Sequence, residues 1–167
     1  MGNLFKSKLL TQECKMHMYR TIIRPVLTYG AETWALTQSE EEELLRHERR
    51  IVRRIYGATR DNQGNFRQRR NEELEQIIGG RNVVRFIKAQ RIRWAGHMAR
   101  MGMDRVQRRI FEEQPMRGRP RGRPRRRWGD GVQRDLRTMG VGDCWRIAED
   151  RGNWRRIVSE AKAHPEL

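Results

Sequence analysis

The chain has 167 residues, with 37 lysines and arginines against 21 aspartates and glutamates, which gives a formal net charge of +16. Hydrophobic residues make up only 36% and charged residues 35%, whereas an average globular domain has about 45–50% and about 25%. This composition argues against the large packed core of a typical enzyme. No apolar run approaches the about 18 residues of a membrane span, and no charged-then-apolar stretch opens the sequence, so we expect neither a membrane span nor a secretory signal. We therefore expect no membrane partner and a nuclear or cytoplasmic location.

The positive charge is carried mostly by arginine, with 32 Arg and 5 Lys. The planar guanidinium grips phosphate in two places and stacks on bases, so the composition indicates a polyanionic partner, most commonly nucleic acid. Arg-rich codon usage in the gene is the alternative explanation. The two cysteines, Cys14 and Cys144, cannot form a disulfide framework, and we expect both to be buried thiols.

The first predicted helix begins after Thr11, which is a suitable N-cap. An apolar stripe at helical spacing follows, made of Cys14, Met18, Ile22 and Val26. Pro25 is expected to kink or end this helix, because proline lacks an N–H and clashes with the preceding turn. Gly30 then breaks the pattern.

The second predicted helix begins at a capping box formed by Ser39 and Glu42, and it ends at Gly57. One face carries Leu44, Glu48, Ile51, Val52 and Ile55, with the glutamate as the polar exception. The other side carries Arg49, Arg50, Arg53 and Arg54. This helix is therefore acidic at its start and basic at its end.

A polar loop is predicted over 61–70, and a short helix from Asn71 to Gly79. A long helix follows, with a stripe at steps of three and four made of Val84, Ile87, Arg91, Trp94, Met98 and Met101. Arg91 lies inside this apolar stripe, so it either snorkels to solvent or points at a partner. One more short helix is predicted around Val106.

The composition changes at Pro115, because seven of the eleven residues in 117–127 are Arg and the rest are Gly and Pro. This stretch should be extended and solvated. A helical hairpin follows, with one stripe in 128–140 and a last helix that begins after Asp143. The sequence therefore predicts an all-α protein in which a basic linker precedes a C-terminal hairpin.

The segment GRPRGRPRRR, residues 118–127, repeats a Gly-Arg-Pro core after four residues and resembles the AT-hook core. Proline pre-extends such a chain, glycine permits close approach, and arginine enters a narrow minor groove of enhanced negative potential. A generic contact with any polyanion and a specific contact with AT-rich DNA both remain open.

Residues for catalysis are not apparent in the sequence. Two-metal polymerases and nucleases need converging carboxylates, but no two aspartates are adjacent here. The four histidines lack zinc-ligand spacing, and no glycine-rich phosphate loop follows a strand. We therefore expect no metal, no cofactor, no small-molecule substrate and no catalytic residue.

Six segments stand in series along nearly the whole chain. They are IIRPVLTYGAETWAL (22–36), HERRIVRRIYG (47–57), RNEEL (70–74), IKAQRIRWAGHMARM (87–101), GRPRRRW (122–128) and DRGNWRRIV (150–158). In this order they resemble the C-terminal end of the endonuclease–reverse transcriptase of LINE-type (non-LTR) retrotransposons.

Together with the change of composition at Pro115, this resemblance predicts four segments: the end of a thumb-like helical bundle (1–36), a helical post-thumb region (37–114), the extended Arg/Gly/Pro linker (115–127) and the C-terminal hairpin (128–167). It also implies a region that holds template RNA and target DNA. The family's Tyr-x-Asp-Asp polymerase hairpin, its endonuclease domain and the Cys/His zinc motif of some relatives are missing from the sequence.

We therefore expect a non-catalytic fragment that grips an RNA or DNA backbone and is not an enzyme on its own, although its parent family is an RNA-directed DNA polymerase with endonuclease. The alternatives are a piece of a longer active polyprotein and a degenerate relic. The expected backbone contacts are Arg49, Arg50, Arg53, Arg54, Arg91, Arg93, Arg117, Arg119, Arg121, Arg123, Arg125, Arg126 and Arg127. Trp94 and Trp128 are candidates for base stacking, although core packing is the more common role for such residues.

Overall fold

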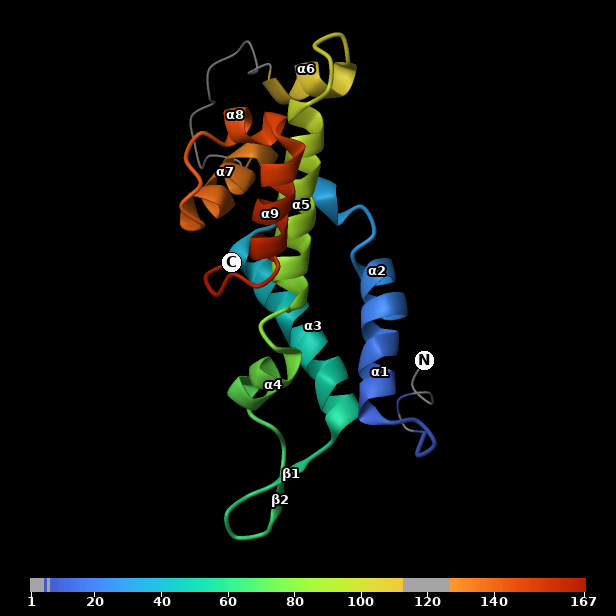
Figure 1. Ribbon diagram of the computed structural model, residues 1–167. Coiled ribbons are helices and arrows are strands. Elements are labelled where there is room, and N and C mark those ends of the chain that lie inside the picture. The colour runs from blue at the N-terminus through green and yellow to red at the C-terminus, as the bar shows by residue number, and fades with distance from the viewer. Residues whose placement is uncertain (1–4, 6, 113–126) are drawn as a thin grey trace. The chain divides into compact units, whose positions relative to one another are not determined.

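The computed structural model describes residue 5, residues 7–112 and residues 127–167, and helices dominate this part of the chain (Figure 1). This confirms the all-α class. The chain divides into two units: unit 1 contains residues 1–29 and 38–84, and unit 2 contains residues 30–37 and 85–167. The four-segment division expected from the sequence stays a prediction, and most of its linker lies outside the described residues.

Unit 1 opens with α1 (Gln12–Met18), a π-helical turn (Tyr19–Ile23) and α2 (Arg24–Leu27). The Thr11 hydroxyl accepts a hydrogen bond from the Cys14 N–H at 3.1 Å, which confirms the predicted cap. The helix continues past Pro25, and the Arg24 N–H reaches back five residues to the Tyr19 carbonyl. The widened turn relieves the clash that a proline ring makes with the preceding turn of a regular α-helix.

The buried face of this first helix is not the predicted stripe. Cys14 is exposed, so its prediction as a buried thiol was wrong, and Val26 is 72% exposed. Met16 and Tyr19 are buried instead, in a cluster that includes Val52. Both stripes fit a helical period, and the packing against α3 selects the second one.

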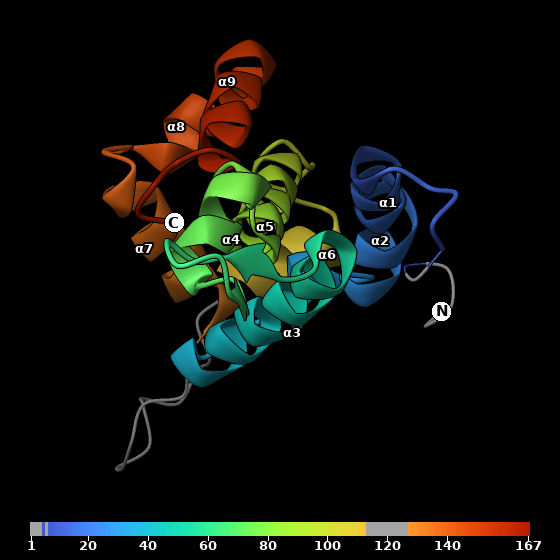
Figure 2. The same cartoon turned by 90° about the horizontal axis from the view of Figure 1, so that it is seen from below.

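α3 (Gln38–Tyr56) and α4 (Asn71–Ile78) complete the core of unit 1 (Figure 2). α3 begins one residue before Ser39, so the predicted N-cap at Ser39 was wrong. The acidic first turn and the stop at Gly57, whose φ is 68°, are as predicted. The core that α3 and α4 share with the N-terminal segment is built from Phe5, Met16, Tyr19, Val52, Ile55, Leu74 and Ile78.

A β-hairpin replaces part of the loop predicted over 61–70. β1 (Thr59–Arg60) pairs antiparallel with β2 (Phe66–Arg67). The strands have two residues each, which is too short for an alternating pattern to appear in the sequence. In Figure 1 the hairpin extends beyond the ends of α3 and α4.

Unit 2 contains most of α5 (Val83–Ala99), then α6 (Val106–Glu112), α7 (Trp128–Thr138), α8 (Cys144–Glu149) and α9 (Arg151–Ala161), together with a short 3₁₀ turn (Ala31–Thr33). The predicted last helix is split in two at Asp150. The Asp150 carboxylate accepts hydrogen bonds from the N–H groups of Gly152 and Asn153 at 2.8 and 3.2 Å, which caps α9 as a separate helix.

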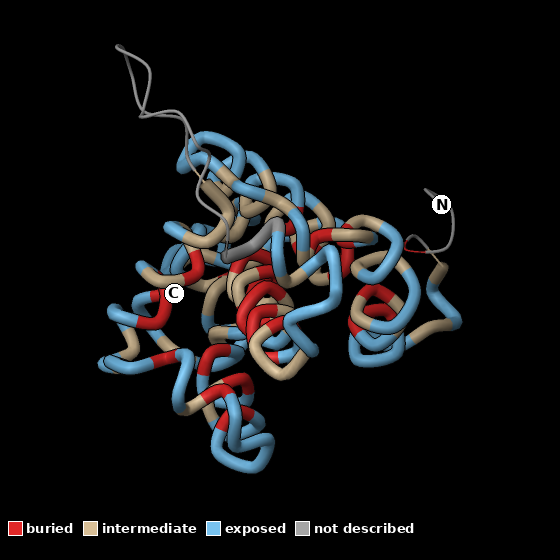
Figure 3. Tube along the Cα trace, turned by 90° about the horizontal axis from the view of Figure 1, so that it is seen from above, coloured by how far each residue is buried: buried red, intermediate tan, exposed pale blue. Residues whose placement is uncertain are grey.

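The core of unit 2 forms where α7, α8 and α9 pack against α5, and it includes Ile92, Ala95 and Leu136. The indole N–H of Trp154 donates to the Ile92 carbonyl at 3.0 Å. Figure 3 shows buried and exposed positions on different sides of the helices. Cys144 is buried in this core, as predicted, and burial raises the pKa of its thiol. None of the described helices is long and apolar enough to cross a membrane.

Candidate nucleic-acid interface

The four arginines predicted on α3 divide into two pairs. Arg53 is half-buried: its Nε donates to the Arg69 carbonyl at 3.2 Å, and its Nη2 donates to Asn71 Oδ1 at 2.6 Å. Arg49 is also half-buried, with its Nε 4.0 Å from Glu75 Oε1. These two side chains fasten α3 to α4 and to the segment before it.

Arg50 and Arg54 are exposed, and within the described part of the chain no hydrogen bond or ion pair engages either side chain. Arg46 precedes them by one helical turn and is also exposed, with its Nε donating to the Glu42 carbonyl at 3.4 Å. The three residues recur every four positions, so they share one face and span about 12 Å of helix. We call them the α3 arginine stripe. Sequence reasoning missed Arg46, although the same spacing of four could have found it.

Arg91 and Trp128 are fixed inside unit 2. Only 3% of Arg91 is exposed, and its Nη1 lies 3.5 Å from Asp135 Oδ2. Arg91 Nη2 also donates to the Trp128 carbonyl at 3.2 Å. The Trp128 indole N–H donates to the Glu32 carbonyl at 2.6 Å, which ties α7 to the 30–37 segment. The buried Arg91 guanidinium therefore neither snorkels to solvent nor lies on the surface, because its contacts are made inside unit 2.

Asp135 lies at the centre of this group. Its Oδ1 is 4.0 Å from Lys88 Nζ, while its Oδ2 faces Arg91. A Cβ atom at Gly131 would overlap the Arg91 guanidinium, so this glycine makes room for the buried cation. A buried cation that kept no anionic partner would cost several kcal/mol, and Asp135 supplies that partner.

The remaining predicted site residues have varied surroundings. Arg93 is exposed on α5. Trp94 is half-buried, and its ring centroid lies 5.1 Å from that of His97. Arg127 is half-buried at the N-cap of α7. The other linker arginines lie outside the described residues, namely Arg117, Arg119, Arg121, Arg123, Arg125 and Arg126.

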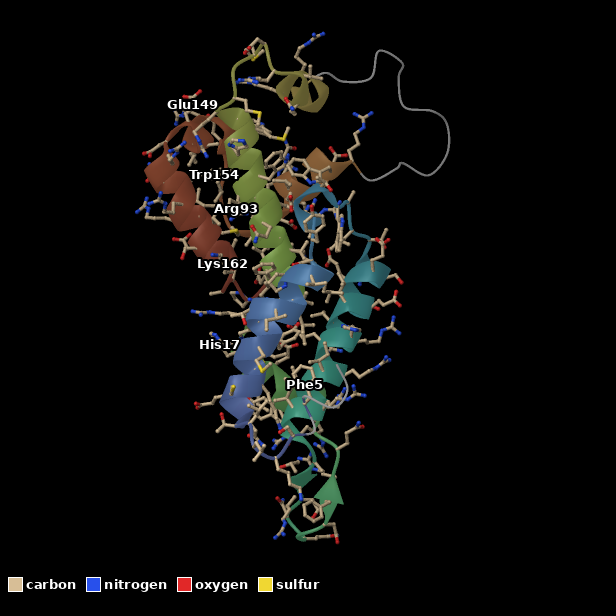
Figure 4. All side chains as sticks on the ribbon, turned by 90° about the vertical axis from the view of Figure 1, so that its right-hand side faces the viewer. Phe5, His17, Arg93, Glu149, Trp154 and Lys162 are labelled. Carbon is tan, nitrogen blue, oxygen red and sulfur yellow. The ribbon has the colours of Figure 1, made fainter. Side chains whose placement is uncertain are left out.

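A second basic stripe, whose residues were not among the predicted contacts, follows α9 to its C-cap residue. Arg151 and Arg155 of α9 and its C-cap residue Lys162 are exposed, and their spacing places them on one face. Figure 4 labels Lys162, the C-cap residue of α9, and Arg93 on α5, the helix against which Trp154 packs. Burial and the nearby charge of Arg151 both lower the pKa of Arg100.

Two acidic side chains of unit 1, Glu48 and Glu73, make internal contacts that stabilise the fold. Glu48 is 1% exposed in unit 1: it accepts from the Tyr19 hydroxyl at 2.7 Å and from the Val83 N–H at 2.8 Å. Glu73 pairs with Arg67 through both oxygens. Among the described residues, no group of three or more His, Cys, Asp or Glu is placed to hold a metal ion.

Comparison with known proteins finds a similarity that covers most of the chain. The chain is 28% identical over 153 residues to a transposon-derived protein of Caenorhabditis elegans, and the match covers 88% of this chain and 54% of that relative. The chain therefore spans about half the length of the curated relative it matches. No family model and no solved structure was found to match. The similarity supports a transposon-related origin for the chain.

Proposed function

We propose that this chain is a non-catalytic nucleic-acid-binding segment related to the C-terminal region of a non-LTR retrotransposon reverse transcriptase. Its arginines grip the phosphate backbone of RNA or DNA, and any polymerase or endonuclease chemistry belongs to other parts of a longer product. The family assignment is supported by the six serial segments and by the similarity to a transposon-derived protein.

The observation that carries the proposal is the α3 arginine stripe. Arg46, Arg50 and Arg54 extend into solvent at a spacing of one helical turn, while their neighbours Arg49 and Arg53 are used for internal contacts. Exposed guanidinium groups in a row bind successive phosphates and release counterions. The net charge of +16 attracts the same partner at longer range.

The test is a salt titration of binding by the full chain to a structured RNA and to an AT-rich duplex. We expect a steep fall of log K with log salt. The variant R46Q/R50Q/R54Q should reduce the duplex slope by about 0.9 for each phosphate that it no longer neutralises. A variant that removes the same charge elsewhere, R134Q/R137Q/R146Q, is the matched control and should keep the slope of the unmodified chain.

Equal reductions of the slope in the two variants would show that only the total charge matters, and the assignment of the stripe would fail. A flat slope or no binding at moderate salt for the unmodified chain would overturn the proposed function and favour the degenerate relic. The ratio of the affinity for the structured RNA to the affinity for the AT-rich duplex shows which nucleic acid the chain prefers.

A further inference from the structure

The β-hairpin of unit 1 has two chemically different faces. Arg60 pairs with Phe66 across the strands, and Thr59 pairs with Arg67. Successive residues of a strand point to opposite faces, so Arg60 and Phe66 share one face, and Thr59 and Arg67 share the other. The Arg67 guanidinium pairs with Glu73 of α4, which makes its face the inner one.

The outer face presents an aromatic ring to solvent. Phe66 is 73% exposed, and the Arg60 guanidinium carbon lies 5.0 Å from the centroid of its ring. The cation lies over one face of the ring, while 73% of the Phe66 residue stays exposed to solvent. The loop between the strands adds exposed polar residues, which are Asn62, Gln63 and Asn65.

Hydrogen bonds hold the hairpin in this conformation. Asp61 Oδ1 accepts from the N–H groups of Gln63 and Asn65 at 2.9 and 2.8 Å. The Asp61 N–H donates to the Asn65 carbonyl at 2.9 Å, and the Gly64 N–H donates to the Asp61 carbonyl at 3.0 Å. The base of the hairpin is fastened by the Arg67–Glu73 pair and by Arg53, which donates to the Arg69 carbonyl. An aromatic ring on such a preorganised loop loses little conformational entropy on binding.

We propose that the outer face of the hairpin stacks an unpaired base of single-stranded nucleic acid on Phe66, while Arg60 contacts the same nucleotide with its guanidinium. This inference rests on the proposed function and adds to it a preference for unpaired bases. Base stacking on aromatic rings is independent of sequence, because every base has a π-face, and a nearby guanidinium strengthens it.

The surroundings of Phe66 favour a nucleotide over an apolar protein surface. Within the hairpin, residues 59–67, Phe66 is the one aromatic residue, and its neighbours there are polar or cationic, whereas a protein-docking patch has contiguous apolar area. The α3 arginine stripe ends at Arg54, and β1 begins five residues later. A strand whose phosphates follow the stripe can thus present its next bases to the hairpin.

The test distinguishes the contribution of the base to binding from the contribution of the phosphate backbone. The probes are an oligo(dT) strand, an abasic phosphodiester strand of the same length and a duplex. We expect F66A and F66L to bind the oligo(dT) strand about 5- to 150-fold more weakly, the range of one stacked base. Both variants should bind the abasic strand and the duplex like the unmodified chain. F66L keeps the apolar character and removes only the ring, and F66W should restore binding.

Normal binding of oligo(dT) by F66L, or an equal loss of affinity for the abasic strand, would overturn the stacking proposal. In either case, an unchanged dependence of binding on salt would still support the proposed contacts with the phosphate backbone. The failure of the stacking proposal can therefore be distinguished from the failure of the proposed function. If the unmodified chain binds none of the probes, both proposals fail. Because Phe66 is exposed, the circular dichroism of the variants should match that of the unmodified chain.

Discussion

The buried carboxylate of Glu48 on α3 connects the helices of unit 1 by hydrogen bonds. Its carboxylate joins three parts of the chain, because it accepts hydrogen bonds from Tyr19 in the first helix and from Val83 at the start of α5. Burial raises the pKa of Glu48, and burial and the adjacent carboxylate raise the pKa of the Tyr19 hydroxyl. A buried carboxylate with two good donors costs far less than one without them.

Tyr19→Phe removes one of these donors and leaves that carboxylate oxygen without its hydroxyl partner. We expect the free energy of unfolding to fall by about 1.5–3 kcal/mol, the usual contribution of a hydrogen bond to a charged group. Denaturant titration measures this fall. Tyr29→Phe is the matched control, because Tyr29 is 87% exposed. Equal midpoints for the two variants would contradict the role assigned to Glu48.

The acid stability of unit 1 should depend on Glu73. Its hydrogen bonds with the Arg67 side chain and the Arg70 N–H lower the pKa of Glu73 from 4.5 to about 2. A folded-state pKa below the unfolded value stabilises the fold fully above pH 4.5, and this stabilisation is lost as the pH falls through 2. Glu73→Gln should therefore flatten the dependence of the urea midpoint on pH in this window.

Glu72→Gln, which changes the exposed neighbour of Glu73, is the control and should keep the acid dependence. Glu48 acts with the opposite sign. Its raised pKa gives a contribution that is present below pH 4.5 and is lost as the pH rises through its folded-state value. A variant at Glu73 that retained the full acid dependence would show that the Arg67 pair contributes nothing.

At the scale of elements, α5 and α9 can approach closely because α5 carries a glycine, Gly96, at their contact. A Cβ atom at Gly96 would overlap the indole ring of Trp154, which is 3% exposed and hydrogen-bonded to the Ile92 carbonyl. Trp154 cannot move away without giving up this bond and its packing. The packing of Trp154 from α9 against α5 thus explains why a glycine occupies position 96 in the middle of α5.

Gly96→Ala should destabilise the protein. Helix propensity favours alanine over glycine by about 1 kcal/mol, but overpacking costs about 1–3 kcal/mol, and a ring that cannot shift puts this site at the upper end. Thermal unfolding monitors the change. Gly142→Ala is the control, because a Cβ atom there meets nothing within 4 Å, and it should be neutral or slightly stabilising. A gain in stability for Gly96→Ala would overturn this packing argument.

The break between α8 and α9 is the clearest difference between prediction and structure among the helices. The apolar period runs through 145–161 almost without interruption, so the sequence predicts one helix. Asp150 adopts an extended backbone, with φ −78° and ψ 106°, and its carboxylate caps α9. Aspartate is a common N-cap, but its effect here depends on α8 and α9 both packing on α5.

For the whole molecule, the charge of +16 opposes compaction, and the buried stripes are short. We therefore expect modest stability that increases when a polyanion binds the folded state. The melting temperature should rise with added RNA in a concentration-dependent way. R46Q/R50Q/R54Q should reduce this rise more than R134Q/R137Q/R146Q does. A melting temperature indifferent to RNA would contradict this linkage.

Most of the helices could be predicted because their signals are local. Thr11 as an N-cap, Gly57 and Gly79 as stops and the apolar periods of α3, α4 and α7 all act within a few residues. The charge and its arginine character likewise follow directly from composition. The hairpin at 59–67 could not be predicted, because its strands are too short to show a period.

The sequence by itself determined the helical class, most helix positions and the strongly basic surface. Only the tertiary structure decided which arginines point outward: Arg50 and Arg54 are exposed, whereas Arg53 and Arg91 are held by internal partners. The same holds for burial, since Tyr19 enters the core and Val26 does not. A helical period fixes which residues share a face, but the side chains of distant elements decide whether that face meets protein or water.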